Sequence, residues 1–410
     1  MHYLLCFILL FFSIPVFSST YHVGKKYGKQ TIQQTLDQSA AGDTILVEPG
    51  IYHEKNLVIQ KSIYLKGSGH PVLDGEGKYE IISIRASNVT VDGFKIIHSG
   101  SGTLEDPAGI KIYNRNNVSI INNYLEDTFF GIYVQNGNNC IIKNNHLASF
   151  ATEEQQIGNG IHCWKCDSMQ IIANTISGHR DGIYFEFVTN SVIWRNISTA
   201  NIRYGLHFMF SNNDAYITNV FRNNGAGVAV MFTQGVKMFN NLFEENWGDA
   251  SYGLLLKEIS DSYIEGNRFV RNTSGIFMEG VSRLRMERNL FKNNGWAMKV
   301  QASCMDITMT SNNFLLNTFD VGTNGSLVLN TFNGNYWDKY EGYDLNKDKI
   351  GDIPFRPVSL FSMIIEKMPP AMMLFRSFMV TILDKTEKIL PSITPENLKD
   401  DSPLIKPLPL

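Results

Sequence analysis

The chain has 410 residues and a formal net charge of −3 at pH 7, from 36 basic and 39 acidic side chains. No basic run or concentrated patch of lysine and arginine is present, which argues against nucleic acid as a partner. A chain of this length must either divide into several domains or fold as a solenoid, whose core grows in length without growing in thickness.

The chain begins with an apolar stretch. Residues 3–17 are almost entirely apolar and are followed by the small residues Ser18 and Ser19. This pattern predicts a secretory signal peptide over residues 1–18, and therefore export to a periplasm or beyond. A membrane anchor is the alternative, because no lysine or arginine precedes the apolar run, but about 15 apolar residues are short for a bilayer span.

A short helix is expected next. Ile32, Leu36 and Ala40 recur at helical spacing between Thr31 and Ala40, so this segment should present one apolar face. It precedes a series of strand-like segments. A helix in this place would cover the first coil of a solenoid, which otherwise exposes a strand edge that favours aggregation.

One pattern then recurs nine times between Gly109 and Asp320, opening with G-I-x-V or a close variant. The openings are GIKI at Gly109, GIYV at Gly131, GIHC at Gly160, GIYF at Gly182, GLHF at Gly205, GVAV at Gly227, GLLL at Gly253, GIFM at Gly275 and AMKV at Ala297. An asparagine follows fourteen residues after each of the first eight openings and fifteen after the ninth. These are Asn123, Asn145, Asn174, Asn196, Asn219, Asn241, Asn267, Asn289 and Asn312.

The period predicts the fold. Most openings are 22 or 23 residues apart, which is too short for helix pairs and typical of one coil per repeat. We therefore predict an all-β, single-stranded right-handed parallel β-helix over residues 19–336, with regular coils at 109–320. Stacked coils would align the asparagines in a hydrogen-bonded ladder, and the opening glycine would accommodate a positive φ. A β-sandwich would not keep the offset constant, and the leucine spacing of a horseshoe is absent.

Strand alternation predicts which side chains face outward. Residues one and three after each opening glycine should enter the core, and those two and four after it should face solvent. The middle of the outward face then gathers His162, Trp164, Tyr184, Glu186, His207, Met209 and Met231. A histidine beside two thioethers suits Cu(I), so we predict a copper site. Its predicted ligands are His162, Glu186, His207, Met209 and Met231. An aromatic and methionine surface for a partner protein is the alternative.

The cysteines allow three interpretations. Cys140, Cys163, Cys166 and Cys304 follow the predicted signal peptide, and HCWKC at 162–166 resembles a metal or redox motif. Cys163 and Cys166 could clamp copper. Cys163 also has the position of a small core residue, and an exported protein permits a disulfide.

An enzyme on this scaffold is the alternative function. Glycoside hydrolysis needs two carboxylates within about 10 Å. The outward acids Glu186 and Glu279 should lie four rungs apart, roughly 19 Å. A secreted polysaccharide lyase or epimerase acting on acidic sugars, through Tyr133, His162, Tyr184, His207 and nearby arginine, remains open.

After Asp320 the composition changes. Asp344, Asn346, Asp348 and Asp352 alternate like the oxygen ligands of a calcium loop, but the EF-hand pattern is incomplete and a solvated turn is the alternative. Pro369 and Pro370 then predict a helix start. An apolar stripe along this helix should partly cap the last coil and partly dock on another protein. The stripe consists of Met372, Phe375, Met379, Ile382 and Leu383.

The C-terminal region also carries a family resemblance. NYWDKYEGYDLNKDKIGDIPFRPV at 335–358, the Met- and Phe-rich segment, LDKTEKILP and the final DSPLIKP resemble NosD, the periplasmic maturation factor family of nitrous oxide reductase. The resemblance implies a non-catalytic protein beside an ABC transporter in the membrane, which receives metal from a copper chaperone and helps to assemble the copper–sulfur centre of the reductase. Residues 337–410 would contact the membrane permease. The predicted copper ligands are inferred from the outward-facing positions of the repeats, and the resemblance does not supply them.

Overall fold

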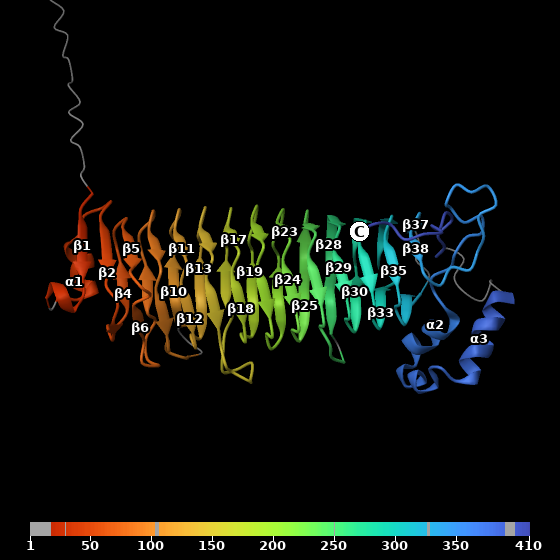
Figure 1. Cartoon of the computed structure of the whole chain (residues 1–410), viewed down its shortest axis with the longest axis horizontal. Coiled ribbons are helices and arrows are strands. Elements are labelled where there is room, and N and C mark those ends of the chain that lie inside the picture. Colours follow the sequence, from red (N-terminus) through yellow and green to blue (C-terminus); the bar gives the residue numbers. More distant parts are fainter. Residues whose placement is uncertain (1–17, 29, 103–105, 250, 326–328, 390–397) are drawn as a thin grey trace, which may run out of the picture.

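The structure is a computed structural model that describes residues 18–28, 30–102, 106–249, 251–325, 329–389 and 398–410. It is a right-handed parallel β-helix whose coils stack along one axis (Figure 1). The predicted fold is therefore confirmed. The predicted signal peptide falls on residues 1–17, which lie outside the described residues, and on Ser18.

Each coil contributes strands to three rows, which we call the opening, second and third rows. The opening row carries the G-I-x-V repeats. It contains β4 (Leu57–Ile59), β7 (Ile82–Ile84), β10 (Ala108–Tyr113), β13 (Phe130–Gln135), β16 (Ile161–Trp164), β19 (Asp181–Glu186), β22 (Tyr204–Met209), β25 (Ala226–Gln234), β28 (Tyr252–Glu265), β30 (Ser274–Glu279), β33 (Trp296–Val300) and β36 (Phe319–Gly322).

The second row joins the opening row through the long strand β28, so that together they form a sheet of 25 described strands. It contains β1 (Thr20–Val23), β2 (Thr44–Val47), β5 (Tyr64–Gly67), β8 (Thr90–Asp92), β11 (Ser119–Ile121), β14 (Ile141–Lys143), β17 (Gln170–Ile172), β20 (Val192–Trp194), β23 (Ala215–Ile217), β26 (Lys237–Phe239), β31 (Ser282–Glu287), β34 (Met305–Thr310) and β37 (Thr331–Asn333).

The third row is a separate sheet of 13 described strands, one per coil. It contains β3 (Ile51–Tyr52), β6 (Val72–Asp74), β9 (Lys95–Ile97), β12 (Tyr124–Glu126), β15 (His146–Ala148), β18 (Thr175–Ser177), β21 (Ile197–Thr199), β24 (Val220–Arg222), β27 (Leu242–Glu244), β29 (Arg268–Val270), β32 (Leu290–Lys292), β35 (Asn313–Leu315) and β38 (Tyr336–Trp337).

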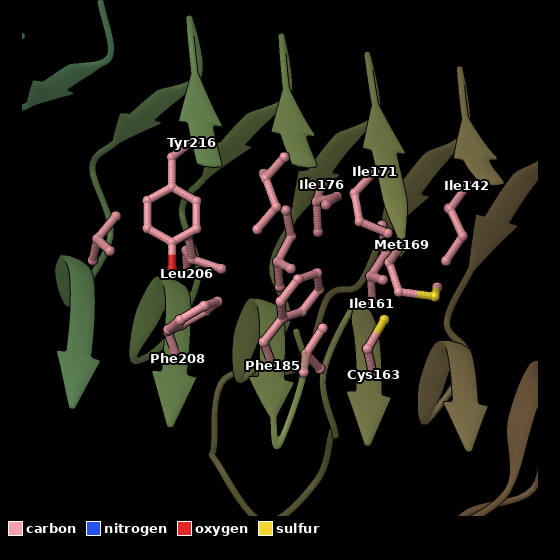
Figure 2. Packing of buried hydrophobic residues seen from close by; sticks show 14 of the residues in the cluster. Ile142, Ile161, Cys163, Met169, Ile171, Ile176, Phe185, Leu206, Phe208 and Tyr216 are labelled. Atoms are coloured by element: carbon pink, nitrogen blue, oxygen red, sulfur yellow. The ribbon is translucent and has the colours of Figure 1, made fainter. Parts of the chain in front are cut away.

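The interior is a continuous apolar column enclosed by the three rows. Figure 2 shows part of it, with Cys163, Phe185 and Phe208 of successive coils pointing inward. Farther along, six buried aromatic rings of the third row stack in register with centroids 4.0–5.5 Å apart. They are Phe221, Phe243, Phe269, Phe291, Phe314 and Trp337. Equivalent side chains pack on one another because each coil repeats the backbone of the previous coil.

The predicted asparagine ladder is present. From Asn123 onward each side-chain amide donates to the Oδ1 of the next asparagine along the ladder, as in Asn219 to Asn241 at 3.0 Å. The backbone N–H of each ladder residue donates to the same oxygen. The ladder continues past Asn312 to Asn335 and ends on the carboxylate of Asp400, which the repeat pattern did not reveal.

A second asparagine ladder runs five residues after the first and was not predicted. It consists of Asn201, Asn224, Asn246, Asn272, Asn294 and Asn317. On the preceding coil His179 occupies the equivalent place, and its backbone N–H donates to Asn201. The spacing N-x-x-x-x-N, as in Asn219 and Asn224, was the available signal.

The opening glycines are required for space, and the expectation that they adopt a positive φ was wrong. Gly109, Gly131 and Gly182 are not among the positive-φ glycines. A Cβ at Gly109 would lie 2.9 Å from Leu125, and a Cβ at Gly182 would overlap Ser198. The chain bends at this point so closely over the core that no side chain fits.

The N-terminal end is closed by the predicted helix. A short 3₁₀ turn, η1 (Lys25–Tyr27), precedes α1 (Ile32–Gln38), which contacts β4. Thr31 and Gln34 form a capping box with both hydrogen bonds at 3.1 Å. The carboxylate of Glu54 accepts two further N–H groups of the first turn, so the orphan donors of this helix end are satisfied.

The C-terminal extension differs from the single helix that was predicted from Pro369 to Leu383. It contains α2 (Leu360–Lys367), the 3₁₀ helix η2 (Pro369–Leu374) and α3 (Phe378–Ile389). The two prolines separate η2 from α2, because they cannot supply the N–H donors that would continue α2. Arg376 adopts a φ of 63°, which separates η2 from α3. No helix in the described part of the chain is long and apolar enough to cross a membrane.

The helices pack on the last coils. Phe361 and Ile365 of α2 contact Trp296 and Phe319 of the opening row, and Lys299 forms an ion pair with Glu366 at 2.9 Å. Figure 1 shows α2 and α3 together at this end of the solenoid.

Candidate functional site

The two outward columns of the opening row lie in the predicted register. Across β16, β19, β22 and β25, the residues two after the glycine align as His162, Tyr184, His207 and Ala229. The residues four after it align as Trp164, Glu186, Met209 and Met231. Met209 therefore has Glu186 on one neighbouring strand and Met231 on the other, as expected from the repeat.

We call the residues two after each opening the inner column and those four after it the outer column. The inner column is less exposed than predicted. Lys111, His207, Ala229 and Leu255, each two after the opening residue, are buried although they point away from the core. On several coils the residue directly before the opening contacts this column, as Phe130, Asp181 and Tyr204 do. Tyr204, for example, places its ring 4.9 Å from the ring of His207.

The inner column forms a continuous row of rings. The ring centroids of Tyr133 and His162 lie 4.5 Å apart, those of His162 and Tyr184 4.8 Å, and those of Tyr184 and His207 4.9 Å. Tyr184 thus stands between the two histidines. The structure brings Glu186, His207, Met209 and Met231 onto neighbouring positions of adjacent coils, but it places His162 one coil farther away.

His207 is held by an ion pair between the buried Asp181 and the partly exposed Arg203, which sequence reasoning missed. Asp181 directly precedes Gly182, is fully buried, and receives two hydrogen bonds from Arg203, from Nε at 2.9 Å and from the terminal nitrogen at 2.5 Å. Nδ1 of His207 lies 3.0 Å from Arg203 and 3.4 Å from Asp181. Burial opposes ionisation of Asp181, yet the hydrogen bonds of His207 and Arg203 hold its pKa below the usual range.

The other ring nitrogen of His207, Nε2, is in different surroundings from Nδ1. Nε2 is buried and makes no hydrogen bond within the described residues. The thioethers of Met209 and Met231 lie nearer the surface, since both residues are partly exposed. Tyr184 donates a weak hydrogen bond to the Met209 sulfur at 3.7 Å. The face therefore carries two partly exposed sulfur donors, and the neighbouring His207 has a buried Nε2 without a hydrogen-bond partner in the described part of the chain.

This donor set is the kind that Cu(I) prefers, because a thioether and a neutral imidazole are soft ligands. No cluster of three or more His, Cys, Asp or Glu suited to a metal occurs in the described part of the chain. A metal on this face would thus depend on the methionine sulfurs.

His162 is a partly buried histidine that stays neutral at pH 7. Its Nδ1 lies 3.0 Å from the side-chain amide of Asn159. Burial, reinforced by the positive charge of Arg180, lowers the pKa of His162 to about 3. Its immediate neighbours are the rings of Tyr133 and Tyr184, so its inclusion among the ligands stays a prediction.

The cysteines lie inside the solenoid. Cys140, Cys163, Cys166 and Cys304 are buried free thiols. Figure 2 shows Cys163 pointing into the apolar core, and burial raises its pKa well above the usual range. The Cys166 thiol lies 3.3 Å from the carbonyl of Trp164 and 3.5 Å from that of Val134. These surroundings favour the interpretation as core residues over a copper clamp or a disulfide.

The proposed calcium loop satisfies itself internally. The carboxylate of Asp344 accepts the backbone N–H groups of Asp348 and Lys349 at 3.2 and 2.9 Å, and Asp352 accepts that of Leu345 at 2.7 Å. Asn346 donates to Asp348 at 2.9 Å. The oxygens point into their own loop, as in the solvated turn, and the calcium prediction gains no support.

The extension leaves an apolar surface open beside α2. Of the predicted docking residues, Met372, Met379 and Ile382 are exposed, and Leu383 packs on the cluster beneath the helices. Phe375 is 38% exposed, and its ring also lies against those of Phe319 and Phe361. Met373 and Phe378, 90% and 80% exposed, enlarge this surface. The sequence stripe therefore divides into packed and exposed side chains on a broken helical path, and its docking role stays a prediction.

The acids of the outer column are far apart, as predicted. Glu186 and Glu279 are separated by Met209, Met231 and Lys257 on consecutive strands. Four strand spacings correspond to roughly 19 Å. This arrangement does not form the carboxylate pair of a glycosidase.

A separate polar cavity of about 780 Å³ lies at the N-terminal end of the same face. It is lined by the partly buried Glu80, which accepts hydrogen bonds from Ser83 and, at 2.9 Å, from the hydroxyl of Tyr113. Burial raises the pKa of Glu80. Glu80 precedes the regular repeats, so the periodic pattern gave no signal for it.

Two family models match the chain. Residues 148–342 match the family described as "Periplasmic copper-binding protein (NosD)", and residues 34–152 match the family described as "Right handed beta helix region". The first match includes His207, Met209 and Met231.

Curated relatives extend over nearly the whole chain. A protein of Stutzerimonas stutzeri named "Probable ABC transporter binding protein NosD" is 27% identical over 393 residues, covering 91% of this chain and 89% of the relative. A protein of the same name from Pseudomonas aeruginosa is 25% identical and covers 86% of each chain.

Solved structures support the fold alone. The surface protein and adhesin PfbA of Streptococcus pneumoniae superposes with a TM-score of 0.55 at 14% identity, covering 71% of this chain and 94% of that chain. DFA-IIIase of Arthrobacter chlorophenolicus A6 gives a TM-score of 0.52 at 14% identity, covering 76% and 86%. One neighbour is an adhesin and the other an enzyme, so the shared solenoid does not decide function.

Proposed function

Because the chain belongs to the NosD family of right-handed β-helix proteins, we propose that it is a non-catalytic periplasmic accessory protein that handles copper. In this proposal it receives Cu(I) from a copper chaperone. Together with an ABC transporter in the membrane, it helps to assemble the copper–sulfur centre of nitrous oxide reductase. Copper is cargo here, not a resident cofactor.

One observation carries the copper part of the proposal. Met209 and Met231 occupy adjacent rungs of the outer column, and His207 lies two residues before Met209 on the same strand, with an Nε2 that has no hydrogen-bond partner among the described residues. Two thioethers and one imidazole near one another match the ligand preference of Cu(I). The ion pair of Asp181 and Arg203 orients the imidazole, in the way that carboxylates orient metal-ligating histidines.

The relatives' printed name supports the transporter part. We assign the contact to the open apolar surface of the extension, formed by Met372, Met373, Phe375, Phe378, Met379 and Ile382. Apolar groups gathered at one end of a solenoid fit a protein partner, because isolated surface patches of this kind are costly in water. Burying each such side chain contributes about 1.5–3 kcal/mol.

A sulfur-specific substitution tests the copper part. Met209→Leu together with Met231→Leu keeps the volume but removes both thioethers, and His207→Ala removes the nitrogen. Cu(I) affinity, measured by competition with a Cu(I) chelator, should fall at least about tenfold in each variant, which is about 1.4 kcal/mol.

Gln135→Ala and Gln301→Ala, in the outer column of other coils, serve as matched controls. A cell that carries the methionine variant should produce nitrous oxide reductase without the absorption of its copper–sulfur centre. Unchanged Cu(I) affinity in both the methionine and histidine variants would refute the copper part.

The transporter part is tested by Met372→Ser with Met379→Ser, two exposed positions. Co-purification with the membrane permease should be lost. Met305→Ser is the control, since Met305 is an exposed methionine on a coil. These substitutions are preferable to deletion of residues 360–410, which would also remove Asp400 from the end of the asparagine ladder.

The enzyme alternative has no specific observation in its favour. The outer acids of the face are four rungs apart, and the enzymes among the solved structures share only the fold. Incubation with alginate and pectate, followed by assays for unsaturated ends and for C5 inversion, distinguishes the alternatives. Turnover abolished by His207→Ala would establish a lyase or epimerase instead.

A further inference from the structure

Arg180 and Arg203 occupy equivalent places on two consecutive coils. Each lies two residues before the opening glycine of its coil, and the backbone N–H of Arg203 donates to the carbonyl of Arg180 at 2.8 Å. Arg203 reaches back to the previous coil, where Asp181, directly before Gly182, accepts two hydrogen bonds from its guanidinium. The residue in the place of Asp181 one coil earlier therefore decides whether Arg180 has the same counter-charge.

That residue is Asn159, which lies directly before Gly160 and carries no charge. Asn159 is fully buried, and its Oδ1 has no hydrogen-bond partner among the described residues. The Nε atom of Arg180 is also buried, and it too lacks a partner in the described part of the chain. Because this donor and this acceptor do not pair, Asn159 does not serve Arg180 as Asp181 serves Arg203.

The charge of Arg180 is left without a counter-charge. Within the described residues Arg180 forms no ion pair, and Asp181, its neighbour in sequence, pairs with Arg203 and His207 instead. Arg180 is partly exposed. A cation that is partly removed from water and has an unsatisfied donor costs stability, and a bound anion would remove this cost.

The groups around Arg180 are hydrogen-bond donors. Burial is the main cause of the low pKa of His162 and the charge of Arg180 is the next, and the same charge opposes the rise that burial causes in the pKa of Tyr184. Arg180 therefore lies near both rings. Nδ1 of His162 lies 3.0 Å from the amide nitrogen of Asn159, so the neutral ring carries its proton on Nε2. The hydroxyl of Tyr184 is a second donor, which is only weakly bonded to the sulfur of Met209 at 3.7 Å.

We propose that Arg180 anchors a binding site for a small ligand that carries a carboxylate or a similar oxyanion, with His162 and Tyr184 as neighbouring donors. A guanidinium can bind two oxygens of such a group at once, which is why arginine is common in sites for carboxylates and phosphates. The site lies on the coil before that of His207. It requires no copper, so its test is independent of the proposed function.

Sodium acetate and inorganic phosphate serve as probes of the intact protein, at pH 7 and constant ionic strength, with chloride as the reference anion. At least one probe should raise the melting temperature in a saturable way up to about 50 mM, because a ligand that binds only the folded state stabilises it. The probe with the higher affinity identifies a planar carboxylate or a tetrahedral oxyanion as the ligand class. Arg180→Gln, which removes the charge and keeps an amide, should weaken this binding at least tenfold.

Asn159→Asp supplies the missing carboxylate from within the chain and reproduces the pair of Asp181 and Arg203. This variant should melt at the same or a higher temperature than the parent, and its affinity for the probe should also fall at least tenfold. Arg195→Gln is the matched control, because Arg195 is an exposed arginine directly after β20 of the second row, and its affinity should stay within twofold of the parent.

A parent that binds neither probe more tightly than chloride would overturn the inference. A probe affinity equal to that of the parent in Arg180→Gln or in Asn159→Asp would overturn it as well, since the bound anion would then not depend on the uncompensated guanidinium. An equal loss of affinity in Arg195→Gln would show that the probes respond to the overall charge of the protein, and would refute a site at Arg180.

Discussion

Asn335 donates its side-chain amide to the carboxylate of Asp400 at 3.0 Å, and its backbone N–H to the same oxygen at 2.9 Å. Asp400 thus occupies the place of the next ladder asparagine, although it comes from a segment 65 residues later. Each asparagine inside the ladder accepts a hydrogen bond from one neighbouring asparagine and donates one to the next. The last rung only accepts, and a carboxylate offers acceptors without leaving an unpaired amide donor.

We therefore predict that Asp400→Ala destabilises the protein by about 3 kcal/mol. The substitution leaves the buried N–H groups of Gly334 and Asn335 and the indole of Trp337 without their acceptor. Urea denaturation at neutral pH measures the loss. Asp401→Ala, an exposed neighbour, should cost less than about 0.5 kcal/mol. Equal effects of the two substitutions would show that the ladder does not need this end.

The opposite substitution should fail inside the ladder. In Asn241→Asp the new carboxylate cannot donate to the carbonyl of Tyr216 or to Asn267, both at 2.9 Å in the native protein. It would instead place two acceptors in contact within the core. We expect a loss of about 3 kcal/mol by urea denaturation. If Asn241→Asp left the free energy of unfolding unchanged, the ladder would not require each internal side chain to donate to the next.

His179 should make the protein less stable as the medium becomes acidic. Burial lowers the pKa of His179 to about 4, and neither ring nitrogen has a partner within the described residues. The unfolded chain takes up a proton near the ordinary pKa of about 6.5. Between these values the unfolded state binds more protons, so the free energy of unfolding falls as pH decreases from about 6.5 to about 4.

His179→Asn is the matched variant, because it would add one rung to the second ladder. The pH dependence of the unfolding free energy between pH 4 and pH 6.5 should be shallower in this variant, in parallel denaturation curves. An unchanged slope would show that His179 is protonated in the folded protein without penalty.

Asp214 should have the opposite pH dependence. Burial raises its pKa to about 8; Oδ1 accepts the N–H of Ser191 at 2.6 Å, and Oδ2 has no partner in the described part of the chain. The folded state keeps its proton between the ordinary pKa of about 3.9 and about 8, where the unfolded state has lost it. Stability from this group therefore falls as pH rises through this window.

Asp214→Asn should remove this dependence and stabilise the protein at pH 8 relative to the parent. Thermal unfolding at pH 5 and pH 8 checks it. A variant whose melting temperature decreases equally at both pH values would indicate that Asp214 is ionised and needed in the fold.

Glycine at the openings should be intolerant of any side chain. A Cβ at Gly182 would overlap the Ser198 hydroxyl, so Gly182→Ala should cost about 1–3 kcal/mol. Gly102→Ala, where no atom lies within 4 Å of the new carbon, should be neutral. Thermal denaturation of both variants decides whether space or conformation requires glycine here.

The sequence alone determined the repeat, the register and the first ladder. A fixed offset from Gly to Asn can be read without any long-range information, and the two-residue alternation of a strand assigns +1 and +3 to the core. For this reason the alignment of Glu186, Met209 and Met231 was predicted correctly. The broken helix at Arg376 was not, because a single residue in the left-handed conformation leaves no periodic signal.

Only the tertiary structure decided what surrounds these columns. The bend at each glycine turns residues such as Asp181 and Tyr204 over His207, and alternation within one strand cannot show that bend. The ring contacts of Tyr184 with both histidines, at 4.8 and 4.9 Å between centroids, likewise depend on the packing of side chains from three coils. Asp400 reached the ladder through a chain reversal that no local pattern encodes. Local backbone geometry fixes the direction of a side chain, whereas its burial and its partners depend on segments that are distant in sequence.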